Sequence, residues 1–313
     1  MNGCQSTRSL VDSESNIDSS VNVLIRVLAV QDSLVEDVIK FTNSQNPIRT
    51  WDLASQNRTQ RRLKREFDEL EKPYIYITRR GDQPKGTTTN RYKNGKLRQI
   101  KLSEVGQHMA ALVGKPVLAY KNKAFIYSSR HDEVFPQDTK VEEVLFASVC
   151  GEESVDVVQA YRKSTQCSEE DGRILIKGGS FFTIAILGEV AKLRNGATYL
   201  KTLAAEQIVS RSGRERIRKY ALYALEAYLR GVKDALENTG TELPTLIRSS
   251  SFFEKVRDRV RTQYRKEVNA GESWFATALP KLVQPATQIN EAPKKRKATS
   301  HERQTTEEKG SEG

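Results

Sequence analysis

Two short runs of β-branched and aromatic residues, at 21–30 (VNVLIRVLAV) and 74–78 (YIYIT), limit the fold most tightly. Such runs predict β-strands, and both lie in the first third of the chain. From about residue 100 to residue 268 the apolar residues recur at helical spacing instead. Because two strands do not form a stable sheet alone, we expect them to pair with other parts of the N-terminal segment. The sequence predicts an α+β fold: a small mixed β/α N-terminal segment, a mostly helical domain and a disordered C-terminal tail.

Capping residues and prolines set the expected helix ends. Asp32 is a typical N-cap, and its helix must end by Asn46 because Pro47 disfavours a helical residue before it. A second helix is expected over residues 51–54 and 58–71, where Pro73 stops it. The helical part is expected to contain helices at residues 103–111, 140–149, 154–161, 180–193, 198–209, 213–236 and 252–268.

The length of 313 residues suits two domains, or one domain with extensions. We expect a mixed β/α segment over residues 1–98, a helical domain over residues 99–272 and a flexible basic and polar tail over residues 273–313. Residues 287–313 are rich in Lys, Glu, Ser and Thr and nearly free of large apolar side chains, which is typical of disorder.

The net charge of +11 is unevenly distributed. Residues 56–101 carry 14 Lys/Arg against five Asp/Glu, whereas residues 132–156 carry eight acidic residues and one basic residue. Basic charge returns at residues 211–233 and 248–266, each with seven basic and two acidic residues. Basic patches attract polyanions through counterion release, so the first patch predicts a nucleic-acid partner. A solvated helix face is the alternative, above all for the two C-terminal runs.

Several protein classes are disfavoured. No run approaches the ~20 apolar residues that cross a bilayer, and no basic then apolar signal peptide opens the chain, so we expect a cytoplasmic protein without a membrane partner. Cys4, Cys150 and Cys167 lack a CxxC spacing, and the three histidines are not at ligand spacing. We therefore expect no metal site of this kind.

Two clusters of amide and hydroxyl side chains are candidate ligand-binding turns. The first offers backbone N–H groups and side chains to a phosphate or a base, and comprises Asn2, Gly3, Gln5, Ser6 and Thr7. The second precedes Pro47 and comprises Asn43, Ser44, Gln45 and Asn46. It predicts a polar pocket wall or a base-reading loop. The alternatives are an unstructured N-terminus for the first cluster and a surface helix end for the second.

Arginines form the third candidate site. Four of them share one face of the expected helix and two follow the second strand: Arg58, Arg61, Arg62, Arg65, Arg79 and Arg80. Guanidinium groups suit phosphates, and the aromatic residues nearby suit stacked bases. The alternative is a solvated helix face with its aromatic residues in the core.

Enzyme signatures are sparse, because no P-loop, GxSxG, HExxH or kinase motif is present. Asp52 is the candidate catalytic residue of a nucleotide hydrolase or a nuclease. A carboxylate there is compatible with Mg²⁺ and a nucleotide as cofactors, although no motif identifies either.

These motifs occur in a characteristic order: NGCQSTRSL, a strand, KFTNSQNPIRTWDLAS, QRRLKREFDEL, and a Tyr-rich strand with TRRGD. The order resembles the abortive-infection phage-resistance (AIPR) family of bacterial proteins, closely over residues 2–82 and more loosely beyond. The matching positions are Asn2, Gly3, Gln5, Thr7, Asn43, Ser44, Gln45, Asn46, Asp52, Gln60, Arg79, Arg80 and Gly81. Family members carry a further segment before the N-G-x-Q turn, so the chain is expected to be a truncated or mis-started member.

The resemblance implies a phage-defence role, with the two amide turns side by side and the arginines supplying charge. DNA or RNA is the expected partner, with a protein of the same defence system as another. Two further functions stay open: a nucleotide hydrolase or nuclease effector, and a non-catalytic regulatory or scaffold module that binds a protein through the acidic region.

Overall fold

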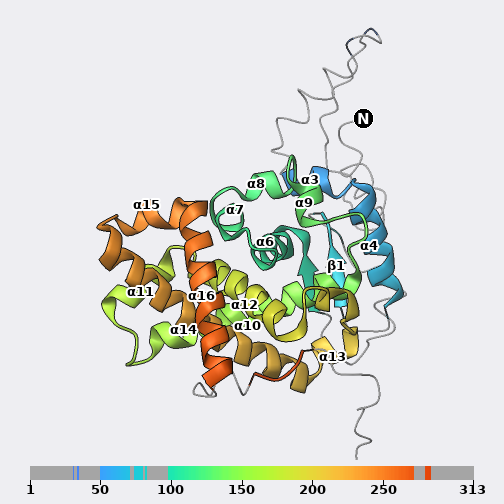
Figure 1. Cartoon of the computed structure of the whole chain (residues 1–313). Coiled ribbons are helices and arrows are strands. Elements are labelled where there is room, and N and C mark those ends of the chain that lie inside the picture. Colours follow the sequence, from blue (N-terminus) through green and yellow to red (C-terminus); the bar gives the residue numbers. More distant parts are fainter. Residues whose placement is uncertain are drawn as a thin grey trace, which may run out of the picture. The chain divides into compact units, whose positions relative to one another are not determined.

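The computed structural model describes residues 31, 34, 50–70, 74–79, 82, 98–270 and 279–282 (Figure 1). All of these residues lie in one compact unit within residues 1–283. The strand predicted at residues 21–30, most of the helix predicted after Asp32, and both amide clusters fall outside the described residues. The predicted division at residues 98 and 272 stays a prediction.

The first described elements are two helices and a strand. Helix α3 spans Thr50–Ala54, α4 spans Arg58–Glu69 and β1 spans Tyr74–Ile77, which confirms the predicted second helix and second strand. Helix α4 packs beside β1 (Figure 1). Strand β1 pairs in parallel with β2, Arg98–Lys101, so that Tyr74 lies opposite Arg98.

Most of the described structure is helical, as predicted. The further elements are α6 (Leu102–Leu112), α7 (Pro116–Lys121), α8 (Lys123–Ile126), α9 (His131–Val134), α10 (Val141–Lys163), α11 (Glu169–Ile176), α12 (Gly179–Asn195), the 3₁₀ helix η2 (Tyr199–Thr202), α13 (Ala205–Val209), α14 (Arg211–Thr239), α15 (Leu243–Arg248) and α16 (Ser250–Ala270). Helices α6, α10, α12 and α14 pack on one another and carry most of the apolar core.

Aromatic stacking extends this core to α16. The rings of Phe182 on α12 and Tyr228 on α14 are stacked with their centroids 5.2 Å apart, and Phe253 on α16 meets Phe182 edge-on at 5.9 Å. Such pairs add about 0.5–1.5 kcal/mol to the free energy of burial. Helices α12, α14 and α16 are thereby joined at one point.

The short helices α7, α8, α9, α11 and α15 were not predicted, and three further elements differ from the sequence predictions. Strand β2 was missed, because Ile100 is its only apolar residue and the strand depends on its partner β1. Helix α10 is continuous where two helices were predicted, since Gly151 lets His108 pack against the helix rather than breaking it. The helix predicted at residues 198–209 is two short elements, separated by Leu203 and Ala204 in extended conformation.

Residues 279–282 lie against the helical core. The backbone carbonyl of Pro280 accepts a hydrogen bond of 2.8 Å from the Tyr220 hydroxyl, and that of Leu279 accepts one of 3.0 Å from Arg194 Nε. Leu279 and Leu282 are buried. Within the described residues no single helix is long and apolar enough to cross a membrane, and α11 with α12 reaches that length only as a pair bent by 83°.

A close approach between α6 and α12 depends on one glycine. A Cβ atom built on Gly188 of α12 would lie 2.5 Å from the Leu112 carbonyl oxygen of α6. That oxygen belongs to the backbone and cannot rotate away, so an added methyl group must push the two helices apart.

We predict that Gly188→Ala lowers the free energy of unfolding by about 1–3 kcal/mol, although alanine favours helix more than glycine does. Gly172 on α11 provides the control, because a Cβ atom there meets nothing within 4 Å. Gly172→Ala should raise the free energy by about 0.5–1 kcal/mol. Urea unfolding of both variants checks the pair, and an equal effect of both substitutions would contradict the close packing.

Candidate nucleic-acid interface

Helix α4 has one face turned into the protein and one face turned to solvent. Its buried residues are Thr59, Gln60, Leu63 and Phe67, which recur at helical spacing. Asn57 caps the helix, with its Oδ1 accepting a hydrogen bond of 2.8 Å from the Thr59 backbone N–H. The cap and the apolar face together set where α4 begins and which side faces outward.

A buried chain of hydrogen bonds fixes the inner face. The Tyr76 hydroxyl donates to Gln60 Oε1 at 2.7 Å, and Gln60 Nε2 lies 3.1 Å from His131 Nε2. Because Gln60 Oε1 is an acceptor in the first bond, its Nε2 is the donor to His131. Gln60 and Tyr76 are fully buried and His131 is 5% exposed. One amide therefore links α4, β1 and α9.

The same bonds assign the proton on His131. Its Nε2 accepts from Gln60, so a neutral ring carries its proton on Nδ1, which lies 3.0 Å from Asp132 Oδ1. With that proton in place, Nδ1 does not accept a hydrogen bond from the Asn57 amide nitrogen, which lies 3.3 Å away. Burial raises the pKa of Tyr76 well above its ordinary value, which keeps its hydroxyl a hydrogen-bond donor at neutral pH.

Three of the four predicted arginines on α4 face solvent. Arg58, Arg61 and Arg65 are exposed, and within the described residues none of their guanidinium groups has an ion-pair partner. Their spacing of i, i+3 and i+7 spreads the charges over about 10 Å of one helix face. These three residues form the open arginine row of the structure.

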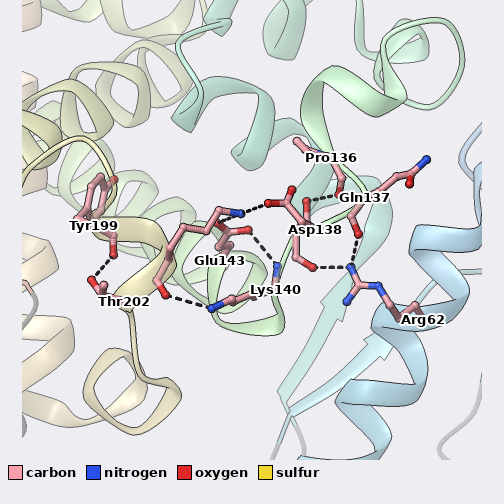
Figure 2. Close-up of polar contacts among 10 residues, drawn as sticks. Arg62, Pro136, Gln137, Asp138, Lys140, Glu143, Tyr199 and Thr202 are labelled. Carbon is pink, nitrogen blue, oxygen red and sulfur yellow. Dashed lines mark hydrogen bonds and ion pairs between the residues drawn. The ribbon is translucent and has the colours of Figure 1, made fainter.

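Arg62 belongs to the same helix, but its guanidinium binds other groups of the protein. Its guanidinium donates to the backbone carbonyls of Gln137 at 3.1 Å and Thr139 at 2.6 Å, as Figure 2 shows. It also pairs with Glu66 at 2.6 Å, and its side chain is 31% exposed. The structure thus separates Arg62, which was predicted as a nucleic-acid contact, from the open arginine row.

The segment that Arg62 holds is also fixed from its other side. Lys201 of η2 pairs with Asp138 at 2.9 Å and with Glu143 at 3.2 Å (Figure 2). The Lys140 ammonium donates to the Lys201 carbonyl at 3.2 Å. Residues 137–140 are therefore held between α4 and η2, which ties the position of α4 to the helical core.

Arg79 follows β1 and reaches the corner between α3 and α4. Its Nε donates to the Ser55 hydroxyl at 2.8 Å, and that hydroxyl donates to the Asp52 carbonyl at 2.6 Å. Arg79 is exposed, and within the described residues its two terminal nitrogens form no hydrogen bond or ion pair. Arg79 therefore stands near the start of α4 with part of its guanidinium open to a ligand.

Asp82 fixes the turn that carries Arg79. Its Oδ2 accepts hydrogen bonds from the backbone N–H groups of Thr78 and Arg79, both at 3.1 Å, and from the Lys64 ammonium at 2.6 Å. Burial alone would raise the pKa of this carboxyl group, but the bonds from Lys64 and Thr78 outweigh it and the net pKa is lowered. Asp82 is thus a charged anchor for the turn at neutral pH.

Asp52, the candidate catalytic residue, lies in the first turn of α3 and is half-buried. Within the described part of the chain, no group of three His, Cys, Asp or Glu side chains comes together as a metal site. The predicted ligand-binding residues Asn2, Gly3, Gln5, Ser6, Thr7, Asn43, Ser44, Gln45 and Asn46, and the predicted contact Arg80, lie outside the described residues.

The acidic region at residues 132–156 is partly neutralised within the chain. Glu152 and Glu153 pair with Arg214 of α14 at 2.7 and 3.0 Å, and Glu143 pairs with Lys201. Glu133 pairs with Lys115 and Arg130. Charges paired in this way are less available to a separate protein partner.

A comparison with protein-family models gives a match to the AIPR protein family over residues 1–269. The chain belongs to the AIPR family. This confirms the resemblance found in the sequence motifs, which is close over residues 2–82 and looser beyond, and the match continues into the last turn of α16. No curated protein and no solved structure matches the chain.

The residues that orient α4 in this AIPR chain were not predicted from the sequence. Tyr76 and His131 contact Gln60 from 16 and 71 residues away along the chain, and no local pattern connects them. Gln60 itself was marked by its position in the family motif. A fully buried amide inside an otherwise apolar helix face is a signal that could have been pursued, because such a group needs partners.

We predict that Tyr76→Phe lowers the free energy of unfolding by about 1–3 kcal/mol, because it leaves Gln60 Oε1 buried without a donor. Tyr120→Phe is the matched control, since the Tyr120 ring is half-buried and its hydroxyl makes no hydrogen bond to a described residue. That change should stay within about 0.5 kcal/mol. Equal values for the two variants in urea unfolding would show that the chain through Gln60 is not stabilising.

We also predict that Arg62→Ala lowers the free energy of unfolding by about 1–3 kcal/mol, because two backbone carbonyls lose a charged donor. Arg61→Ala, one residue away on the exposed face, should change it by less than about 0.5 kcal/mol. Thermal unfolding of both variants checks the difference. A larger loss for Arg61→Ala would contradict the division of roles between the two arginines.

Proposed function

We propose that this AIPR-family chain is a phage-defence protein that binds nucleic acid through the open arginine row of α4. Family membership supports the defence role. The observation that carries the binding role is the exposure of Arg58, Arg61 and Arg65 on a helix whose opposite face is fixed by Gln60. In this proposal the protein acts in the cytoplasm.

The geometry of the row suits a phosphate backbone. Three guanidinium groups spread over about 10 Å can each donate to the oxygens of successive phosphates. A rigid helix holds them in place, so binding does not have to order the backbone that carries them. Arg79 adds a fourth donor near the start of α4, with its Nε already fixed by Ser55.

The amide turns are the proposed source of selectivity. Gln5, Asn43 and Gln45 would donate and accept hydrogen bonds at the edges of bases. Arginines that contact only the phosphate backbone of the nucleic acid cannot distinguish one base from another. Arg80, beside Arg79 in sequence, would add to the charge. In this scheme the arginines supply affinity and the amides supply discrimination, and only the first part depends steeply on salt.

No specific observation supports the alternative of a nucleotide hydrolase or nuclease. None supports the alternative of a scaffold module either. Asp52 has no neighbouring group of metal-binding side chains among the described residues. The acidic side chains Glu143, Glu152 and Glu153 are paired within the chain. Nucleic-acid binding by α4 therefore remains the better-supported function.

We predict that the triple variant Arg58→Glu/Arg61→Glu/Arg65→Glu binds DNA and RNA oligonucleotides at least about 100-fold more weakly at low salt. Three lost charged contacts of roughly 1.5 kcal/mol each account for such a change, and the new acidic groups add repulsion. Fluorescence anisotropy with labelled oligonucleotides measures the affinity. Circular dichroism should show unchanged helix content, because the three side chains are exposed.

The matched control carries the same change of charge elsewhere. Lys255, Arg265 and Lys266 are exposed on α16, and none has an ion-pair partner among the described residues. Lys255→Glu/Arg265→Glu/Lys266→Glu should weaken binding by less than about tenfold, through the altered net charge alone. Equal weakening in both triple variants would mean that net charge, rather than the α4 face, determines binding.

A further inference from the structure

A second group of arginines surrounds a hollow at the beginning of α14. The hollow has a volume of about 400 Å³ and is lined by Arg98, Arg211, Arg214 and Arg218 together with Glu153, Glu215 and Val209. Arg98 is the first residue of β2, and the other three arginines belong to the first turns of α14. Two elements distant in sequence thus direct four guanidinium groups to one place.

Arg214 forms the shortest ion pairs with the acidic residues at this hollow. Arg214 pairs with Glu152 at 2.7 Å and with Glu153 at 3.0 Å, and its side chain is only 19% exposed. Its guanidinium also lies close to the Tyr74 side chain of β1. Arg214 therefore acts as a brace between β1, α10 and α14.

The other arginines of the hollow have weaker partners. Arg98 lies 3.7 Å from Glu152, and Arg218 lies 3.5 Å from Glu153, which are longer than charged hydrogen bonds of 2.7–2.9 Å. Among the described residues, Arg211 pairs only with Glu215, one helical turn away, with the two side chains 94% and 62% exposed. Exposed ion pairs of this kind contribute about 0–1 kcal/mol, so an incoming anion can displace them easily.

Charge and donor geometry define the ligand. Four guanidinium groups face the three carboxylates of Glu152, Glu153 and Glu215, which leaves a net positive hollow. Arginine forks match the oxygens of a phosphate group and bind them in pairs. The backbone N–H groups in the first turn of the 29-residue helix α14 add a favourable dipole for an anion.

We infer that the hollow formed by Arg98, Arg211 and Arg218 around the Arg214 brace is a phosphate-binding site. Its place in the fold suggests the carrier of that phosphate. Tyr74 begins β1, lies opposite Arg98 and contacts Arg214, and β1 packs beside α4. We take the carrier to be the nucleic acid that binds the open arginine row, because Tyr74 connects the hollow to β1 and β1 packs against α4; this identification rests on the proposed function.

Two variants with opposite expected effects test the site. Arg98→Gln/Arg218→Gln removes two donors but keeps the Arg214 brace, and should weaken the binding of inorganic phosphate at least about tenfold. Glu215→Gln removes the carboxylate that competes for Arg211, and should strengthen phosphate binding by a few fold. Glu215 is 62% exposed, so its replacement does not threaten folding. Arg173→Gln/Arg230→Gln, which removes two exposed arginines outside the hollow, should leave phosphate binding unchanged.

Isothermal titration calorimetry of the full chain with inorganic phosphate, and separately with an oligonucleotide, distinguishes the sources of the phosphate. If Arg98→Gln/Arg218→Gln weakens the binding of both inorganic phosphate and the oligonucleotide, the hollow binds a phosphate of the nucleic acid. Weakening of phosphate alone supports a site for a free phosphate or a small phosphate ester. No phosphate binding by the unmodified chain, or equal binding by all variants, overturns the inference.

The same titrations separate this inference from the proposed function. The triple glutamate variant of α4 should lose oligonucleotide binding and keep phosphate binding in the hollow. If that variant keeps oligonucleotide binding, the α4 proposal fails while the phosphate site stands. If Arg98→Gln/Arg218→Gln lowers the midpoint of thermal unfolding, the test of the phosphate site uses Glu215→Gln alone. An unchanged phosphate affinity in Glu215→Gln then overturns the inference.

Discussion

The side chain of Gln60 joins three parts of the molecule that are distant in sequence. Its carbonyl oxygen accepts from Tyr76 on β1, and its amide nitrogen donates to His131 on α9. Because both bonds are buried, rotating α4 about its axis would leave several polar atoms without partners, each costing about 1–3 kcal/mol. The outward direction of Arg58, Arg61 and Arg65 is a consequence of that constraint. The functional face of α4 therefore depends on the polar contacts of its opposite face.

The basic residues divide into three groups by what they contact. Arg62 and Arg214 donate to groups inside the protein and hold segments together. The open arginine row has no such partners among the described residues. Arg98 and Arg218 lie between these cases, with contacts of 3.7 and 3.5 Å. A count of charges along the sequence cannot make these distinctions, because each depends on residues from another element. Surface position and pairing together identify the arginines that remain available to a polyanion.

Local patterns in the sequence were sufficient for the elements that depend on local forces. The helix α4, which was expected from its apolar spacing and the following Pro73, and the strand beginning at Tyr74 were both predicted. Strand β2 was not, because RQIK buries only Ile100 and becomes a strand through pairing with β1. Arg58, Arg61 and Arg65 were predicted as a group from helical spacing alone. Separating Arg62 from them required knowing that residues 137–139 lie beside α4, and no local pattern carries that information.

Binding of a phosphate backbone by exposed arginines on a fixed helix is tested most directly by the salt dependence of that binding. Each phosphate neutralised on duplex DNA contributes about −0.9 to the slope of log K against log salt concentration. Contacts from Arg58, Arg61, Arg65 and Arg79 predict a slope of about −3 to −4, measured by anisotropy with a duplex oligonucleotide over a range of salt concentrations. A slope shallower than about −1, or no binding at low salt, would contradict the account.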